Sequence, residues 1–192
     1  KQLFSLFKMN DFARFDGWLL PSGEIWFSDF NTVSGMEQNS FLFQQSSRLG
    51  MSHSDLLNYV VKNSCHRQKI NFPSLDKKSE KIKRKPVSVI FGGRTSERQV
   101  SLMSGTNVWL KLRGSKIYKP KPYLLDFENN VWELPYALIL NHTVEEIIEN
   151  TKNAGKEKEK NENLVNRIKE ELKLFGEEAT ELFFMPQKIS LK

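Results

Sequence analysis

Apolar and polar residues alternate along residues 12–31, with a break at Pro21-Ser22-Gly23. Alternation with a period of two predicts two β-strands joined by a turn. Over residues 40–62 the apolar positions follow helical spacing instead, and Gly50 interrupts them. We therefore expect a β-hairpin followed by two helices. Either Ser52 or Ser54 is placed to cap the second helix, whose apolar stripe is Leu56, Leu57, Val60 and Val61.

A second apolar pattern begins at residue 86. Residues 86–91 predict a short strand and Gly92-Gly93 a turn, and residues 96–99 match the capping box that opens a helix. A second apolar run at residues 123–125 predicts another strand. Residues 86–126 therefore predict a strand–helix–strand unit, the beginning of a parallel sheet in an α/β fold.

The remaining residues, 127–192, predict helices, and the unit that they belong to ends incomplete. A capping box at Thr143 and Glu146 opens one helix, which fades into the charged residues 156–160. An amphipathic pattern over residues 164–175 predicts a second helix.

Composition indicates a soluble protein of one large or two small domains. The chain has 192 residues, of which 39% are hydrophobic and 27% are charged, and its mean hydropathy is −0.51. No apolar run approaches the roughly 18 residues that span a bilayer, and the first residues do not have the pattern of a secretory signal. They also lack a Met, so we expect the chain to be part of a longer one.

The net charge of +6 is concentrated in one segment. Nine Lys or Arg residues lie between residues 62 and 85 against two acids, so this segment carries +7 and the rest of the chain about −1. Residues 63–85 therefore predict a basic linker. The alternative is a nucleic-acid-binding adaptor acting through residues 62–85. We favour no nucleic-acid partner, because the segment has neither interleaved aromatic residues nor a known binding module.

Cysteine and histidine offer no redox or transition-metal chemistry. Cys65 is the only cysteine, which excludes an internal disulfide and favours a reducing compartment. His53, His66 and His142 do not pair at zinc-ligand spacing.

The hairpin carries the most informative side chains. With a two-residue turn at Ser22-Gly23, Asp16 lies opposite Asp29 and Arg14 opposite Asn31, all on one face. Two facing carboxylates repel unless a cation lies between them. Carboxylate and amide oxygens suit Mg²⁺, and Arg14 could stabilise negative charge that develops on a transferred group. The alternative is an exposed face whose acids pair with Arg14 and water.

Residues 13–41, ARFDGWLLPSGEIWFSDFNTVSGMEQNSF, resemble the C-terminal end of D-alanine–D-alanine ligases, which belong to the ATP-grasp superfamily. Residues 89–108, VIFGGRTSERQVSLMSGTNV, resemble the N-terminal opening of the same family. The resemblance implies that residues 1–62 end an ATP-grasp domain as a hairpin plus helices. It also implies that residues 86–126 start a Rossmann-like substrate domain. Residues 127–192 resemble no part of the family core, so they are expected to be a helical insertion, here incomplete.

The C-terminal resemblance precedes the N-terminal one, and no segment resembles the ATP-binding centre of the family. We interpret this order as a window across the junction of two tandem ligase modules, in preference to a circular permutation. The fragment alone is then expected to be inactive.

The resemblance implies an activity for the parent chain. ATP would phosphorylate one D-alanine, and the amino group of a second would attack the acyl phosphate to give a dipeptide for peptidoglycan, the cell-wall polymer that maintains cell shape. The implied cofactors are ATP and Mg²⁺, with Mn²⁺ as an alternative. The expected location is the cytoplasm, without membrane contact. The implied partners are other modules of the parent chain or a second copy in a homodimer.

The resemblance also assigns roles in phosphate and metal binding. Asp16, Asp29 and Asn31 would hold Mg²⁺, while Arg14 and the backbone N–H of Gly35 would stabilise the tetrahedral intermediate. Asp29 departs from the Glu that is usual in the family and is one methylene shorter. Ser34 stands where Pro commonly precedes the glycine.

Three further residues would bind substrate by the same resemblance. Ser40, with Phe41 beside it, would bind the carboxylate of the second D-alanine, and Glu97 would hold the ammonium group of the first. Phe41 replaces a smaller aliphatic residue of the family. Structural alternatives remain: Ser40 could be a helix N-cap, Glu97 could interact only with a helix dipole, and Gly92-Gly93 could be only a tight turn. The alternative function is a degenerate, non-catalytic scaffold or small-molecule binding module. The acceptor could be D-alanine, D-lactate or D-serine.

Overall fold

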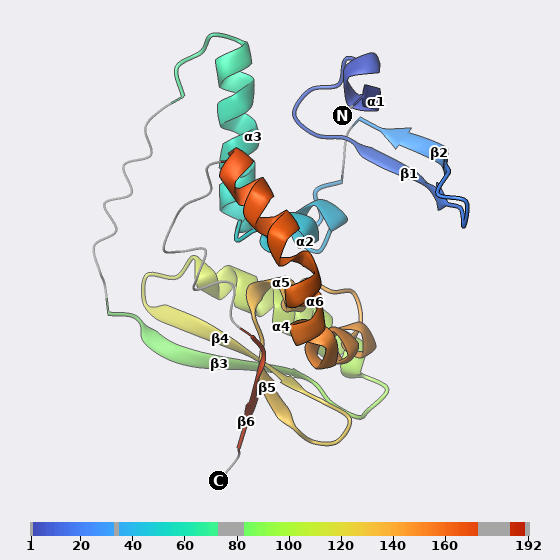
Figure 1. The fold of residues 1–192 in the computed structure, drawn as a ribbon. Coiled ribbons are helices and arrows are strands. Elements are labelled where there is room, and N and C mark those ends of the chain that lie inside the picture. The colour runs from blue at the N-terminus through green and yellow to red at the C-terminus, as the bar shows by residue number, and fades with distance from the viewer. Residues whose placement is uncertain (1, 33–34, 73–82, 173–184, 191–192) are drawn as a thin grey trace. The chain divides into compact units, whose positions relative to one another are not determined.

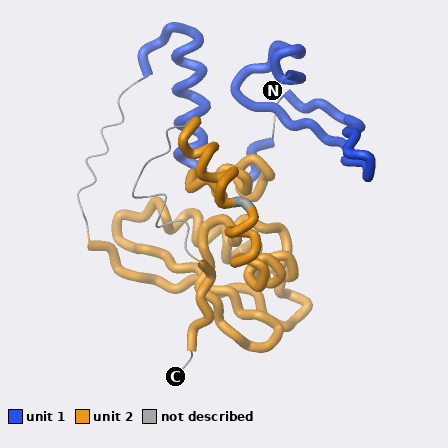
Figure 2. The backbone as a smooth tube through the Cα atoms, in the orientation of Figure 1, with its two compact units in different colours: residues 1–37, 53–75 blue, residues 38–52, 76–192 orange. Residues whose placement is uncertain are grey.

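The computed structural model of the chain describes residues 2–32, 35–72, 83–172 and 185–190. The chain divides into two compact units (Figure 2). The hairpin unit comprises residues 1–37 and 53–75, and the sheet unit comprises residues 38–52 and 76–192. Among the described helices, none has both the length and the apolar character needed to cross a membrane.

The hairpin unit contains α1 (Gln2–Leu6), β1 (Arg14–Leu19), β2 (Ile25–Asn31) and α3 (His53–Arg67). β1 and β2 pair antiparallel, which confirms the predicted hairpin. α3 begins directly after Ser52, one of the two predicted capping positions. Its last residue, Arg67, donates hydrogen bonds of 2.8 and 2.9 Å to the carboxylate of Asp11.

The predicted turn of the hairpin is wrong by one residue. The N–H of Leu20 donates to the carbonyl of Glu24, and the N–H of Gly23 donates to the carbonyl of Leu20. The loop therefore has three residues, 21–23. Gly23 takes a φ of +84°, which an L side chain rarely adopts, so glycine suits the end of this loop.

A β-bulge compensates for the longer loop. Near the turn Gly17 pairs with Phe27, but the register shifts between Asp16 and Gly17, so that Asp16 lies opposite Asp29. A Cβ atom on Gly17 would collide with the carbonyl oxygen of Trp26 on the opposite strand. The predicted pairing of the acids is therefore confirmed, because the bulge restores the register that the loop displaces.

Phenylalanines cover one face of the hairpin. Phe15 lies 5.2 Å from Phe30 and 6.1 Å from Phe27 between ring centroids, and Phe7 lies 5.2 Å from Phe30. Because strand side chains alternate, this cluster leaves the polar residues of β1 and β2 on the other face.

The sheet unit is built on four strands, β3 (Lys85–Gly92), β4 (Tyr118–Leu125), β5 (Val131–Glu133) and β6 (Gln187–Ile189), in that spatial order. β3 and β4 are parallel, whereas the β4–β5 and β5–β6 pairs are antiparallel. α4 (Arg98–Arg113) joins β3 to β4 and packs on both strands (Figure 1). The predicted strand–helix–strand unit and α/β class are confirmed.

The core of the sheet unit lies between the sheet and its helices. Gly105 of α4 allows close packing on Phe91, because an added Cβ would come within 2.7 Å of the Phe91 ring. Ile90, the neighbour of Phe91 in β3, is 62% exposed, as alternation in a strand with one covered face requires. The fully buried apolar side chains are Leu124, Leu134, Ile139, Leu140, Val144 and Ile147.

Prolines limit the sheet at one edge. Pro120 and Pro122 alternate in β4 and cannot donate backbone hydrogen bonds. β5 pairs with β4 only from Tyr123 onward, so the first half of β4 has a strand neighbour only in β3 among the described residues. Proline at an edge position is favourable because no donor is lost there.

Two expectations for residues 127–192 are corrected. The segment is not purely helical, because it supplies β5 and β6 to the sheet in addition to α5 (Tyr136–Ile139) and α6 (Val144–Leu172). α6 is also one helix of 29 residues where two were predicted. The charged residues 156–160 alternate Lys and Glu, both good helix formers, so they continue the helix. Residues 173–175 of the predicted second helix lie outside the described residues.

α2 (Phe41–Ser47) belongs to the sheet unit and packs on α5. Its buried face includes Phe43, Ser46 and Ser47. The hydroxyls of the two serines donate to backbone carbonyls three residues earlier, so these polar groups are satisfied without partners on α5. The predicted break between the helices is present, with Gly50 at a φ of +89°.

The segment expected to be a basic linker is partly regular. α3 continues to Arg67 and β3 begins at Lys85. Residues 73–82 lie outside the described residues.

Candidate functional site

The polar face of the hairpin brings four predicted residues together. Arg14 lies opposite Asn31, and Asp16 lies opposite Asp29. The Nε of Arg14 donates to both carboxylate oxygens of Asp16, at 3.0 and 3.2 Å. The two acids therefore face each other across neighbouring strands, and one of them is already paired with the arginine.

Asp29 has its own set of donors. Its Oδ1 accepts from the backbone N–H of Phe30 at 2.8 Å, and its Oδ2 accepts from the Nδ2 of Asn31 at 2.9 Å. The amide of Asn31 thus faces Asp29 with its nitrogen, and its oxygen is the atom it would offer to a cation. The repulsion between the two acids is reduced without a metal, because each carboxylate accepts at least one hydrogen bond.

The donor set suits a hard divalent cation. Two carboxylates and one amide oxygen on a single exposed face leave positions for water and phosphate oxygens, as Mg²⁺ prefers. Among the described residues, no group of three or more His, Cys, Asp or Glu side chains is placed to bind a metal. A metal on the hairpin would therefore depend on Asn31 and outside ligands as well as the two acids.

Gly35 lies in the same unit as the four hairpin residues and is exposed. An added Cβ there would make only an ordinary contact, 3.6 Å from Glu37. The residue therefore lies at the surface of the protein. Ser34, the preceding residue, lies outside the described residues.

Ser40 occupies the N-cap position of α2 in the sheet unit, but its side chain makes no capping hydrogen bond. Its hydroxyl oxygen is buried and has no hydrogen-bond partner among the residues that the structure describes. Buried hydroxyls normally have a partner, because leaving one without costs about 1–3 kcal/mol. The position agrees with the N-cap alternative, but the bonding expected of an N-cap is missing.

Phe41 is 61% exposed and lies edge-on to the ring of His142, with centroids 5.5 Å apart. The Nε2 of His142 is 3.0 Å from the carbonyl oxygen of Asn39, and the Nε2 of Gln44 donates to the same carbonyl at 2.9 Å. The carbonyl of Asn39 is thus satisfied by Gln44, and the ring of His142 lies beside it. Sequence reasoning missed this cluster, because His142 lies about 100 residues from α2 and no motif connects them.

Glu97 is exposed at the N-cap of α4 and makes no capping bond with its side chain. The predicted capping box at residues 96–99 is wrong, because Gln99 serves another helix. The Oε1 of Gln99 accepts from the N–H of Val144 at 3.1 Å and so caps the start of α6. Half of the second predicted capping box is present, since the N–H of Glu146 donates to the Oγ1 of Thr143 at 3.1 Å. The carboxylate of Glu146 accepts from the N–H of His142 at 3.0 Å, one residue before the expected donor, Thr143.

Arg98 and Gln99 also fix the start of α6 through Glu145. The Nε of Arg98 is 2.7 Å from Glu145, and the amide nitrogen of Gln99 donates to the same carboxylate. The backbone N–H of Glu145, Arg98 and Gln99 all donate to this carboxylate and, against the effect of burial, hold its pKa below the ordinary value. These contacts tie the first turn of α4, which follows Glu97, to the first turn of α6.

Gly92 and Gly93 form the turn that leads from β3 toward Glu97. Their φ angles are +94° and +100°, and a Cβ on Gly92 would lie 2.7 Å from the carbonyl oxygen of Leu125. The hydroxyl of Ser101 accepts from the N–H of Gly92 at 3.2 Å. Glycine is therefore required at this turn by backbone geometry alone, as the tight-turn alternative states.

The predicted site residues fall into two sets. Arg14, Asp16, Asp29, Asn31 and Gly35 lie in the hairpin unit, whereas Ser40, Phe41 and Glu97 lie in the sheet unit. The roles that the resemblance assigns to these residues stay predictions.

Comparison with known proteins identifies the family. Residues 86–185, just over half of the chain, match the family model described as the D-ala D-ala ligase N-terminus. This match includes most of the segment that sequence reasoning set apart as an insertion. Residues 1–62 match the D-ala D-ala ligase C-terminus. No curated protein and no solved structure matches the chain. With the C-terminal region first and the N-terminal region second, the chain belongs to the D-alanine–D-alanine ligase family.

Proposed function

We propose that the parent of this chain is an ATP-dependent ligase that joins two D-amino acids, D-alanine in the first instance, for a peptidoglycan precursor. D-alanine–D-alanine ligases use ATP, usually with Mg²⁺. The observation that carries the proposal is the facing pair Asp16 and Asp29, with Arg14 and Asn31 on the same face, in a chain of this family.

Asp16, Asp29 and Asn31 would hold Mg²⁺ through oxygen atoms. When bound there, the ion would neutralise charge on the phosphates of ATP. The exposed ion pair between Arg14 and Asp16 is no obstacle, because such pairs contribute about 1 kcal/mol or less. A cation that binds Asp16 would release Arg14 for a second anion.

In the joining step, the amino nitrogen of one amino acid bonds to the carbonyl carbon of the other, which carries the phosphoryl group. Negative charge develops on the carbonyl oxygen, and the C–O bond to phosphate then breaks as the amine loses a proton. Arg14 and the N–H of Gly35 are the donors we assign to this oxygen. A guanidinium and a backbone N–H cost little reorganisation when the charge appears.

Ser40 and Glu97 are the substrate-binding residues of the proposal. The buried hydroxyl of Ser40 would donate to the carboxylate of the second amino acid, which supplies the partner it otherwise lacks. The exposed carboxylate of Glu97 would accept from the ammonium group of the first. In tandem modules these two residues serve different active sites.

One observation favours a non-catalytic scaffold as the second candidate. Both carboxylates of the proposed metal site already have partners within the chain, Arg14 for Asp16 and Asn31 for Asp29. A scaffold of this kind would keep the hairpin without binding a metal.

Titration of the chain with Mn²⁺, followed by electron paramagnetic resonance, distinguishes the two candidates. We expect saturable binding that Asp16→Asn and Asp29→Asn each weaken at least tenfold. Glu24→Gln, a carboxylate on the same hairpin outside the site, should leave binding unchanged, and Arg14→Gln should strengthen it by removing a competing cation. If Mn²⁺ does not bind, or if all carboxylate variants bind alike, the scaffold replaces the ligase. D-alanine-dependent phosphate release by the parent protein then tests the substrate.

A further inference from the structure

Glu97 lies on a short turn whose backbone is held by the residue that follows it. The N–H of Arg98 donates to the carbonyl oxygen of Thr95 at 3.2 Å, and the Nη1 of the same arginine donates to that oxygen at 3.1 Å. The carbonyl oxygen of Glu97 accepts from the N–H of Ser101 at 2.9 Å. The backbone is therefore fixed on both sides of Glu97, although its exposed side chain makes no capping hydrogen bond.

The guanidinium group of Arg98 also reaches two other parts of the sheet unit. Its Nε donates to the Oε1 of Glu145, in the first turn of α6, at 2.7 Å. Its guanidinium carbon lies 5.6 Å from the ring centroid of Phe127, between β4 and β5. One side chain thus connects the turn before α4, the loop after β4 and the start of α6.

Gln99 makes a second connection to the same place. Its Oε1 accepts from the N–H of Val144, and its Nε2 donates to the Oε2 of Glu145. The carboxylate of Glu145 therefore accepts from Arg98 with one oxygen and from Gln99 with the other. Ion pairs at a protein surface contribute most where several groups form a network, and this pair is part of one.

The network also determines which acid pairs with Arg98. Arg98 is adjacent to Glu97 in the sequence, but its charge is compensated by Glu145. Without the Glu145 carboxylate, the guanidinium group would be free to pair with Glu97. A guanidinium on that carboxylate would compete with any ammonium group that binds there.

We propose that Glu145 is a positioning residue for Glu97. By holding Arg98 it keeps the turn at residues 95–98 closed, and it leaves the carboxylate of Glu97 available for the ammonium group of an amino acid. Glu145 does not itself touch the substrate in this arrangement. The inference rests on the proposed function, in which Glu97 binds the first of the two D-amino acids.

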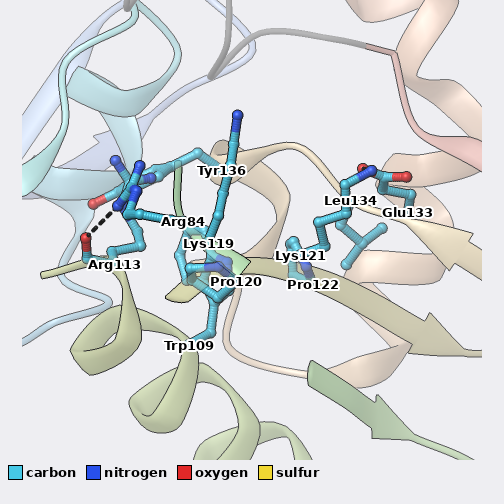
Figure 3. Close-up of a pocket in the computed structure, with 10 residues that line it drawn as sticks. All are labelled: Arg84, Trp109, Arg113, Lys119, Pro120, Lys121, Pro122, Glu133, Leu134 and Tyr136. Atoms are coloured by element: carbon cyan, nitrogen blue, oxygen red, sulfur yellow. Dashed lines mark hydrogen bonds and ion pairs between the residues drawn. The ribbon is translucent and has the colours of Figure 1, made fainter. Parts of the chain in front are cut away.

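Hydrogen exchange of the chain tests the positioning. In Glu145→Gln the amide protons of Arg98 and Ser101, which close the turn, should exchange about fivefold faster, as loss of one exposed ion pair predicts. The far end of α4, where Trp109 and Arg113 line the cavity shown in Figure 3, is an internal reference and should be unchanged. Glu149→Gln is the matched control, because it removes the same charge from an exposed residue one turn further along α6.

Steady-state kinetics of the parent protein with D-alanine tests the consequence for binding. Glu145→Gln should raise the KM for the first amino acid about fivefold, while kcat and the KM for the second change less than about twofold. Adding Arg98→Gln to Glu145→Gln should lower the first KM again, because the competing cation is then absent. A purely structural role predicts that the double variant is no better than the single one.

The outcomes separate this inference from the ligase proposal. Unchanged exchange in Glu145→Gln, or an equal change in Glu149→Gln, would overturn the positioning role and leave the ligase proposal intact. An equal rise in both KM values, or no recovery in the double variant, would overturn the connection to Glu97. A wild-type parent that releases no phosphate with D-alanine would overturn the ligase proposal and this inference together.

Discussion

The hairpin and the four-stranded sheet differ in how much of their apolar surface is buried. Large apolar residues of the hairpin remain exposed, including Trp18 at 62% and Trp26 at 58%. The sheet is covered by α4 on one face, and Leu124 at its centre is fully buried. Two-stranded hairpins have marginal stability without further packing. The hairpin therefore depends on local geometry, whereas the sheet depends on its core.

Because of this difference, the buried core and the proposed metal-binding residues lie on different elements of the chain. The proposed metal-binding residues lie on the element with little core of its own, where an exposed face remains open to phosphates and water. Substitutions in the two units should therefore differ in how much they lower the free energy of unfolding. They should also differ in which unit is destabilised.

The largest effect is expected for Leu124→Ala in the sheet. Truncation of a fully buried leucine leaves a cavity and typically costs about 3 kcal/mol or more. Urea unfolding followed by hydrogen exchange should show loss of stability for amides of β3, β4 and α4, with hairpin amides unaffected. The matched variant Ile90→Ala, on the exposed face of the same sheet, should cost less than about 1 kcal/mol. Similar losses in both variants would mean that the second face of the sheet is also covered.

The buried Asp126 is expected to have the next effect. Its carboxylate accepts four hydrogen bonds at 2.8–2.9 Å, from the backbone of Glu128 and Asn130 and the side chains of Asn130 and Trp132. Burial alone would raise the pKa of Asp126, but the hydrogen bonds outweigh it and the pKa is lowered. Asp126→Asn keeps the shape, replaces an acceptor by a donor and should cost about 2 kcal/mol at neutral pH.

The pH dependence follows from the direction of this shift. Because the pKa of Asp126 is lower in the folded than in the unfolded chain, its stabilisation is complete above the unfolded value of about 3.9 and is lost as the pH falls through the folded value. Asp11 contributes in the same sense, because hydrogen bonds from Arg67 lower its pKa. The difference between wild type and Asp126→Asn in urea midpoint should shrink below about pH 4. A constant difference down to pH 2 would contradict this assignment.

The smallest effect, confined to the hairpin, is expected for Gly17→Ala. The added Cβ would meet the Trp26 carbonyl, so the bulge must open, at a local cost of about 1–2 kcal/mol. Cross-strand nuclear Overhauser effects between Asp16 and Asp29 should weaken, while the sheet unit unfolds as in wild type. Gly35→Ala is the control, because its Cβ meets only an ordinary contact. Unchanged Asp16–Asp29 contacts in Gly17→Ala would show that the bulge does not set the register.

Sequence reasoning predicted well where one physical signal dominated. Alternation along residues 12–31 predicted the hairpin. The opposition of Asp16 and Asp29 was predicted from a two-residue turn that is wrong, and it holds because the bulge restores the register. The apolar run at residues 86–91 and the glycines after it predicted β3 and its turn. In these segments local propensity and tertiary packing favour the same structure.

Predictions failed where a distant partner decided the outcome. Gln99 was expected to cap its own helix, but it bonds to Val144, a residue 45 positions away. β5 is only three residues long, so its alternation is too short to detect without β4 beside it. The predicted turn has two residues, whereas the loop has three. The sequence did not reveal the bulge that makes the longer loop compatible with the pairing of Asp16 and Asp29.

The position of α2 affects how the gene can be divided. The backbone passes from one unit to the other three times, at residues 37–38, 52–53 and 75–76. A cut at residue 86, where the match to the N-terminal family region starts, would discard α2 and expose the surface of α5 that it covers. The family boundary is thus a poor place for an expression boundary. Genetic fusion or exchange of modules should keep residues 38–52 together with the sheet that follows them.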